Sequence, residues 1–159
     1  RDRSGEGGGR GRRRCKRQTN KRSGWKTYPL SNYTEKRPWG SFTILDEGKG
    51  FKVKRITVEA GEKLSLQYHN RRSEHWTVVY GTLTVTVGEV TYELKVNESA
   101  YIPITEKHCI ANHTNDFAEI IEIQIGDYLF EDDIVRLEDR YGRTTPEPNE
   151  VPHLPKGTT

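Results

Sequence analysis

The stretch LSLQYHNRRSEHW, from Leu64 to Trp76, combines the start of a β-strand with a concentration of ligand-type side chains. Its first half reads as a strand, so Gln67 and His69, two positions apart, project from the same face. The NRRS segment predicts a turn, and the next strand starts at Glu74. Three side chains with nitrogen or oxygen donors are therefore expected to converge from one hairpin.

Short strand-like runs continue on both sides of this hairpin, from SFTIL at residues 41–45 to AEIIEIQI at residues 118–125. Turn-forming segments such as DEGKG, EAGEK and NHTND separate them. Strands at spacings of about 8–12 residues favour an all-β antiparallel sandwich or barrel over alternating strands and helices. The segment EDDIVRLEDRYGR, at residues 131–143, is predicted to hold one helical turn or an ordered loop.

Charge is distributed unevenly along the 159 residues, whose net charge is +3. Residues 1–27 contain eleven of the 26 Lys and Arg but only two of the 23 acidic residues. We therefore predict a basic, disordered arm or linker at residues 1–35, a folded domain at 36–143 and an extended Pro-rich tail at 144–159. The arm is more simply explained as a solvated charge run than as an RNA-binding segment, so no nucleic-acid partner is expected.

Several classes of protein are disfavoured by composition. Hydrophobic residues make up 31% of the chain and no apolar run approaches 18 residues, so neither a membrane span nor secretion is indicated. Cys15 and Cys109 lie far apart in dissimilar surroundings, which disfavours a disulfide and favours a reducing cytoplasm. The sequence contains no Met, which predicts either that it begins inside a longer reading frame or that its beginning is irregular.

A second segment supplies a further imidazole. Pro103 suits a strand end, ITEK forms a turn, and His108 begins another strand that can face the same pocket. A ligand set of Gln, His, Glu and His contains no thiolate and suits Zn, Mn, Fe, Co or Ni. Each His alone is more commonly a hydrogen-bonded core residue, so the metal hypothesis depends on all four residues together.

These spacings resemble the two motifs of the cupin superfamily, G-x5-H-x-H-x4-E-x6-G and G-x5-P-x-G-x2-H-x3-N. Gln67 stands at the first His of motif one, and Asn97 and Thr105 stand at the two Gly positions of motif two. The segments RPWGSF, FKVKRITVEAGEKLSLQ, EHWTVVYGT and IEIQIGDYLFEDDIVRLEDRYGR are similar to the C-terminal isomerase domain of the bifunctional mannose-1-phosphate guanylyltransferase/mannose-6-phosphate isomerase enzymes. The resemblance covers residues 37–143 and implies a double-stranded β-helix, the cupin jelly-roll barrel. The chain departs from the family at NRRS, since the family often has a His-rich run at these positions.

The resemblance implies a metal-dependent isomerase that interconverts mannose 6-phosphate and fructose 6-phosphate by proton transfer through an enediol(ate). The metal would be divalent, with zinc as first choice, and its ligands would be Gln67, His69, Glu74 and His108. A cupin that binds metal and sugar phosphate without catalysis, and a mononuclear iron oxygenase, are the alternatives.

Cationic side chains complete the predicted site. Arg136 and Lys63 are the catalytic candidates, the arginine because it can stabilise an oxyanion or a phosphate. Candidates for binding the substrate are Arg72, Lys107 and Arg143. The expected partners are a small-molecule sugar phosphate and a second copy of the chain in a homodimer.

Overall fold

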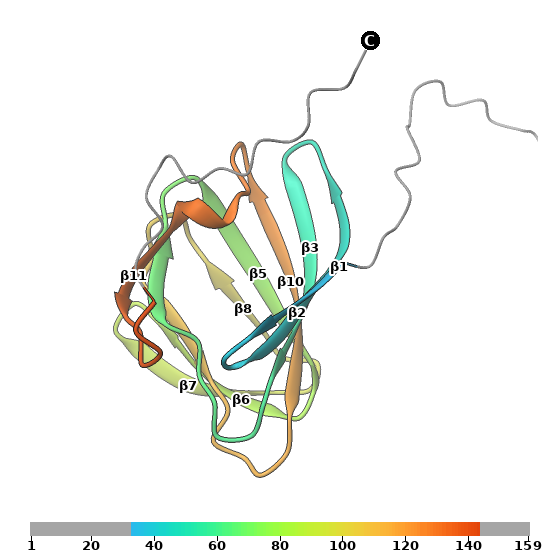
Figure 1. Cartoon of the computed structure of the whole chain (residues 1–159), viewed down its shortest axis with the longest axis vertical. Helices are drawn as coiled ribbons and strands as arrows, with labels where there is room; N and C mark the ends of the chain where they lie inside the picture. The colour runs from blue at the N-terminus through green and yellow to red at the C-terminus, as the bar shows by residue number, and fades with distance from the viewer. Residues whose placement is uncertain (1–32, 144–159) are drawn as a thin grey trace, which may run out of the picture.

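The computed structural model describes residues 33–143, which form a barrel of two facing sheets (Figure 1). Within these described residues all of the strand pairs are antiparallel, and one turn of 3-10 helix, η1, precedes the strand β11. The elements in chain order are β1 (Tyr33–Arg37), β2 (Gly40–Gly48), β3 (Phe51–Val58), β4 (Leu66–His69), β5 (Arg72–Tyr80), β6 (Thr82–Val87), β7 (Val90–Lys95), β8 (Ser99–Ile102), β9 (His108–Ala111), β10 (Ala118–Gly126), η1 (Glu131–Asp133) and β11 (Ile134–Glu138). The predicted all-β double-stranded β-helix is confirmed.

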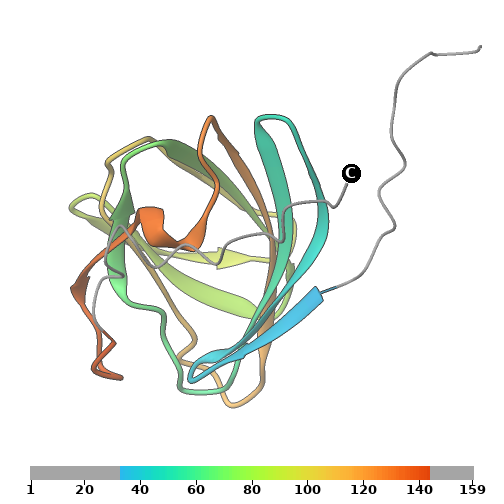
Figure 2. The same ribbon diagram turned by 45° about the horizontal axis from the view of Figure 1, so that its top comes forward.

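The strand order explains how residues distant in sequence meet. One sheet has the order β1-β2-β3-β10-β5-β8 and the other has the order β11-β4-β9-β6-β7. The consecutive strands β4 and β5 belong to opposite sheets, so their connection crosses one end of the barrel (Figure 2). This alternation between sheets is typical of jelly rolls, which keep room for side chains or a ligand between their walls.

The inward faces of both sheets share one apolar core. It is built from β-branched, aromatic and aliphatic side chains, among them Trp39, Phe42, Ile56, Val58, Trp76, Val78, Leu83, Val85, Leu94, Ile102, Ile110 and Ile120. Burying a side chain of this size stabilises the fold by about 1.5–3 kcal/mol. The inward face of β10 becomes polar towards the end of the strand, where Glu122 and Gln124 are buried. Ile123 and Ile125, which alternate with them, point outward and are exposed. Polar side chains therefore replace the core at one end of the barrel.

Two edge strands extend beyond the sequence-based prediction. β1 begins at Tyr33, ahead of the predicted boundary at residue 36. Where one helical turn or a loop was predicted, η1 is followed by the strand β11, which pairs with β4 at the edge of the second sheet. The predicted arm and tail fall almost wholly on residues 1–32 and 144–159, outside the described part, so the domain division stays a prediction.

A glycine fixes the path between β1 and β2. Gly40 pairs with Arg37 across the turn and has a φ of 142°. A Cβ at this position would lie 2.1 Å from the backbone oxygen of Thr57, so only glycine lets the chain pass this closely. Within residues 33–143, no helix is long and apolar enough to cross a lipid bilayer.

Candidate metal centre and binding pocket

The connection between β4 and β5 is held in place by a buried carboxylate. Asp133 of η1 accepts hydrogen bonds from the backbone N–H groups of Asn70 and Arg71, both at 3.2 Å. These two residues link His69, the last residue of β4, to Arg72, the first residue of β5. The contact therefore fixes how the two halves of the hairpin approach each other.

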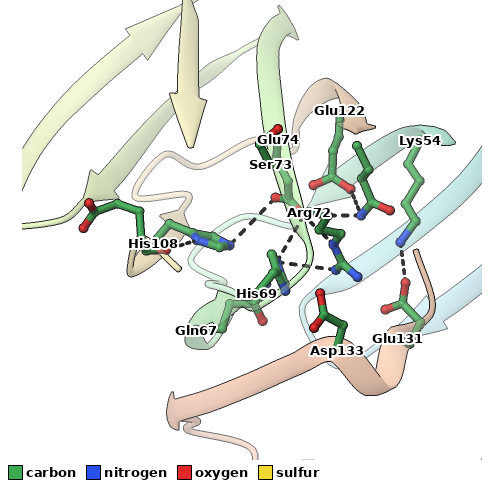
Figure 3. A network of polar contacts seen from close by, with 12 residues as sticks. Lys54, Gln67, His69, Arg72, Ser73, Glu74, His108, Glu122, Glu131 and Asp133 are labelled. Carbon is green, nitrogen blue, oxygen red and sulfur yellow. Dashed lines mark hydrogen bonds and ion pairs between the residues drawn. The ribbon is translucent and has the colours of Figure 1, made fainter. Parts of the chain in front are cut away.

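His69, Glu74 and His108 come together between the two sheets (Figure 3). The Nε2 atom of His69 lies 3.1 Å from Oε1 of Glu74, and Nε2 of His108 lies 3.8 Å from Oε2 of the same carboxylate. All three side chains are at most 2% exposed, and their ligand atoms lie within 4.8 Å of one another. Imidazole nitrogens and a carboxylate gathered this closely are a donor set that divalent transition metals use.

The hydrogen bonding of His108 favours metal coordination. Its Nδ1 lies 2.8 Å from the backbone oxygen of Glu106, and a carbonyl can only accept, so Nδ1 carries the proton. Burial lowers the pKa of His108 to about 4, so at neutral pH its Nε2 carries a lone pair. That atom is buried without a hydrogen-bond partner among the described residues. A neutral imidazole oriented through its other nitrogen is the usual state of a metal ligand, so the residues fit a metal.

Glu74 is the centre of the polar network. Although burial opposes ionisation, the hydrogen bond with His69 and the charge of Arg72 hold the pKa of Glu74 well below its usual range. Arg72 Nε donates to Glu74 Oε1 at 3.1 Å, and Trp76 Nε1 donates to Oε2, also at 3.1 Å. The carboxylate is therefore ionised and held from two sides.

A second buried carboxyl group lies next to Glu74. Glu122 accepts hydrogen bonds from Trp76 Nε1 at 3.1 Å and from Gln124 Nε2 at 2.7 Å. Burial, reinforced by the charge of Glu74, raises the pKa of Glu122 to about 8. The two carboxyl groups thus differ in protonation at neutral pH, and only Glu74 adds negative charge to the cluster.

Gln67 lies on the same strand as His69 and lines the neighbouring pocket. Its backbone pairs with His108 on β9 and with Arg136 on β11. Its Oε1 accepts a hydrogen bond from Ser65 Oγ at 2.8 Å, which leaves a second lone pair on the same oxygen. Its role as a fourth ligand stays a prediction.

The pocket between the sheets leaves about 480 Å³ between its walls, including the part open to solvent. Its charged lining is mainly cationic and consists of Arg37, Lys54, Arg72, Arg136 and Arg143 with Glu74, Glu122 and Glu131. Because Glu122 is protonated at neutral pH, five cations face two ionised carboxylates. The pocket is therefore suited to an anion.

The structure brings some of the predicted cationic residues to this pocket and not others. Arg72, Arg136 and Arg143 line it. Arg72 is 2% exposed and donates to the backbone oxygen of Phe130 at 3.0 Å, so much of its guanidinium is engaged inside the protein. Lys107 lines a separate hollow. Lys63 forms an isolated bridge with Ala111 and precedes β4, so strand alternation counted back from Gln67 does not place it in the pocket.

Five charged or amide side chains of the pocket lining were not predicted from the sequence, namely Arg37, Lys54, Glu122, Gln124 and Glu131. A signal existed for Lys54, because it alternates with the inward-facing Ile56 and Val58 in FKVKRITV. Glu122 and Gln124 were harder to assign, because isoleucines occupy both faces of β10. Arg37 and Glu131 depend on long-range folding and carry no local signal.

Comparison with solved structures defines the class of fold. The RmlC-like cupin from Shewanella frigidimarina superposes with a TM-score of 0.54 at 18% sequence identity, over 63% of this chain and 88% of that chain. The protein is therefore a cupin by fold. The fold and the cluster of His69, Glu74 and His108 together suggest a metal site.

The family described as "Mannose-6-phosphate isomerase C-terminal" matches residues 29–139. The chain belongs to this family. The alginate biosynthesis protein AlgA of Pseudomonas aeruginosa is 56% identical over 108 residues, which are 68% of this chain and 22% of that protein. The mannose-1-phosphate guanylyltransferase ManC of Salmonella typhimurium is 50% identical over 107 residues, 67% of this chain and 22% of that protein. The chain thus matches only about a fifth of each relative's length.

The names of these relatives contradict the function predicted from the sequence. An interconversion of mannose 6-phosphate and fructose 6-phosphate through an enediol(ate) was expected as the function of the chain. The relatives are instead named for alginate biosynthesis and as a mannose-1-phosphate guanylyltransferase. The prediction assigned the activity of the cupin region to the function of the whole relatives. The cupin motifs cannot separate the activity of this region from the function of the longer proteins that contain it.

Proposed function

We propose that the chain is the cupin module of an enzyme that acts on phosphorylated mannose, and that this module binds a divalent metal and a mannose phosphate. The observation that carries the proposal is the buried cluster of His69, Glu74 and His108 beside a pocket with an excess of cationic side chains. The sugar is suggested by the names of the family and of ManC. Fold alone would not specify a ligand.

The metal would be held by Gln67, His69, Glu74 and His108, and zinc is the first choice for such a nitrogen and oxygen donor set. A bound divalent ion supplies Lewis acidity, which polarises an oxygen atom of the sugar. Arg72 keeps Glu74 ionised and oriented through its hydrogen bond. Arg136 and Arg143 contribute positive charge to the pocket that would receive the substrate.

Two further parts of the proposal concern the setting of the module. A homodimer is expected because symmetric dimers are the commonest assemblies of soluble proteins, and light scattering on the purified chain tests it. A location in the reducing cytoplasm also stays a prediction and depends on the cysteine usage.

Calorimetric titration tests the proposed function. The zinc-loaded chain is titrated with mannose 6-phosphate, mannose 1-phosphate and unphosphorylated mannose, before and after treatment with a chelator. We expect at least one of the phosphates to bind more tightly than mannose, and to bind more weakly after chelation. His69→Ala should weaken binding, whereas His75→Ala should not, because His75 lies on the outward face of β5 against Tyr101. A zinc-loaded chain that binds neither phosphate would contradict the proposal.

A further inference from the structure

We propose that Arg37 on β1, together with Arg136 and Arg143, forms the subsite that binds the phosphate group of the sugar phosphate. This inference rests on the proposed function and assigns a role to Arg37, which begins the segment RPWGSF but was not among the site residues predicted from the sequence. Arg37 on β1 is distant in the sequence from Arg136 on β11 and from Arg143 in the segment that follows β11. All three line the same pocket.

The position of Arg37 is fixed by its surroundings. Its guanidinium lies over the ring of the buried Phe42, with its carbon 5.5 Å from the ring centroid. Glu35 contacts its Nη2 at 2.7 Å, and the Gly40 turn sets the path of the strand that carries it. The side chain is 26% exposed. A half-buried guanidinium held in this way keeps donors for another oxyanion, because Arg carries five N–H groups in a fixed fork.

Arg143 is held in a similar manner. Asp139 accepts hydrogen bonds from its Nε at 3.1 Å and from its Nη2 at 2.5 Å. The ring of Tyr141 lies 5.1 Å from its guanidinium carbon. Asp139 thus orients the guanidinium and engages two of its three nitrogens, so Nη1 retains its donors. A positioned guanidinium binds a phosphate in the bidentate geometry that this group favours.

The charges of the other two arginines act on Arg136. Burial lowers the pKa of Arg136, and the charges of Arg143 and Arg37 lower it further. The charges of Arg143 and Arg37 therefore act on Arg136 in the pocket that all three line, and Asp139 and Glu131 offset part of their effect. Repulsion of this kind is relieved when an anion binds between the groups, and a phosphate with several oxygens and up to two negative charges is a good match.

In this proposal the arginine cluster binds the phosphate group and the metal cluster binds the hydroxyl groups of the sugar. Glu74 of the metal cluster lines the same pocket as the three arginines, so a sugar whose phosphate binds the arginines would have its hydroxyl groups on the side of this cluster. The cross-strand pairing of Arg136 with Gln67 places the two clusters next to each other at the β4–β11 edge. A phosphorylated hexose, which carries both kinds of group, can then contact both clusters.

Titration of matched variants with mannose 6-phosphate, mannose 1-phosphate, mannose and inorganic phosphate tests the subsite. Arg37→Ala should weaken binding of the better mannose phosphate about 10-fold or more, since hydrogen bonds to charged groups are strong. Mannose itself should bind as it does to the wild type. Lys36→Ala is the matched control, because Lys36 is the neighbouring cation on β1 and is exposed. If Arg37→Ala does not remain folded by circular dichroism, Arg37→Lys keeps the charge, loses the fork and should still bind several-fold more weakly.

The outcomes separate this inference from the proposed function. A chain that binds a mannose phosphate equally well with Arg37→Ala, or with Arg37→Lys where the alanine variant is unfolded, overturns the subsite and leaves the function standing. A chain that binds inorganic phosphate through Arg37 but binds no mannose phosphate supports the anion subsite and contradicts the proposed function. A wild-type chain that binds none of the phosphates overturns both.

Discussion

Lys54 on β3 and Glu131 in η1 are 77 positions apart in the sequence, yet Lys54 Nζ lies 2.5 Å from Glu131 Oε1 (Figure 3). The lysine side chain is 4% exposed and the glutamate side chain is 38% exposed. The pair joins the first sheet to the segment that ends in β11 and places both residues in the lining of the pocket. A buried ammonium needs a partner of this kind, because an unpaired charge in the interior is costly.

Glu131→Gln should therefore destabilise the protein by about 1–2 kcal/mol at neutral pH, a value reduced by the partial exposure of the pair. Burial opposes ionisation of Glu131, but the charges of Lys54 and Arg72 lower its pKa from 4.5 to about 2. Because the folded-state pKa is the lower one, the stabilisation is present above pH 4.5 and is lost as the pH falls towards 2. Urea unfolding at several pH values should show a shallower decline for the variant over this range. An identical pH dependence in both proteins would contradict the assignment.

Thr105 has a φ of 67°, a left-handed conformation that a β-branched residue adopts only with strain. We expect Thr105→Gly to raise the free energy of unfolding by about 0.5–1 kcal/mol, despite the greater flexibility of glycine in the unfolded chain. Asn97→Gly is the matched comparison, because Asn97 has a φ of 73° but Asn tolerates this region better. Calorimetry should show the larger rise in Tm for the threonine variant. A fall in Tm for Thr105→Gly would refute the strain.

Asp133→Asn removes one of the two oxygens that accept from the turn after His69. The variant should lose about 1–2 kcal/mol of stability, because one backbone N–H is left without its partner. It should also bind zinc about 10-fold more weakly, because the turn orients His69 against Glu74. Competition with a chromophoric chelator measures the zinc affinity. Asp132→Asn serves as the control, since Asp132 accepts from Tyr128 and not from the turn; equal effects of the two changes would argue against the turn as the cause.

The sequence predicts the barrel well because its signals are local. Alternation and turn residues locate the central strands, and the spacing from Gln67 to Glu74 places candidate ligands on one hairpin. Edge strands are harder to predict. The segment YTEKR of β1 is polar, and among the described strands β11 pairs with β4 alone, at the edge of the second sheet.

The pocket wall depends on contacts that no local pattern encodes. Arg37 lies at the pocket because the turn at Gly40 sets the path of β1, the strand that carries it. Lys63 and Lys107 were chosen by strand counting and loop position, and the irregular backbone before β4 removes the basis for counting at Lys63. The metal hypothesis was accessible from sequence because its side chains are few, chemically distinctive and confined to two short segments, the hairpin of Gln67, His69 and Glu74 and the strand that begins at His108.

Metal content per chain, measured by mass spectrometry after zinc loading and removal of free ions, tests the central claim most directly. The claim is that His69, Glu74 and His108 hold a divalent ion in the cupin barrel. The wild type and the His75→Ala control should each retain about one ion per chain, whereas His69→Ala should stay folded by circular dichroism and retain little. Full retention of zinc by His69→Ala, or none by the wild type, would contradict the account.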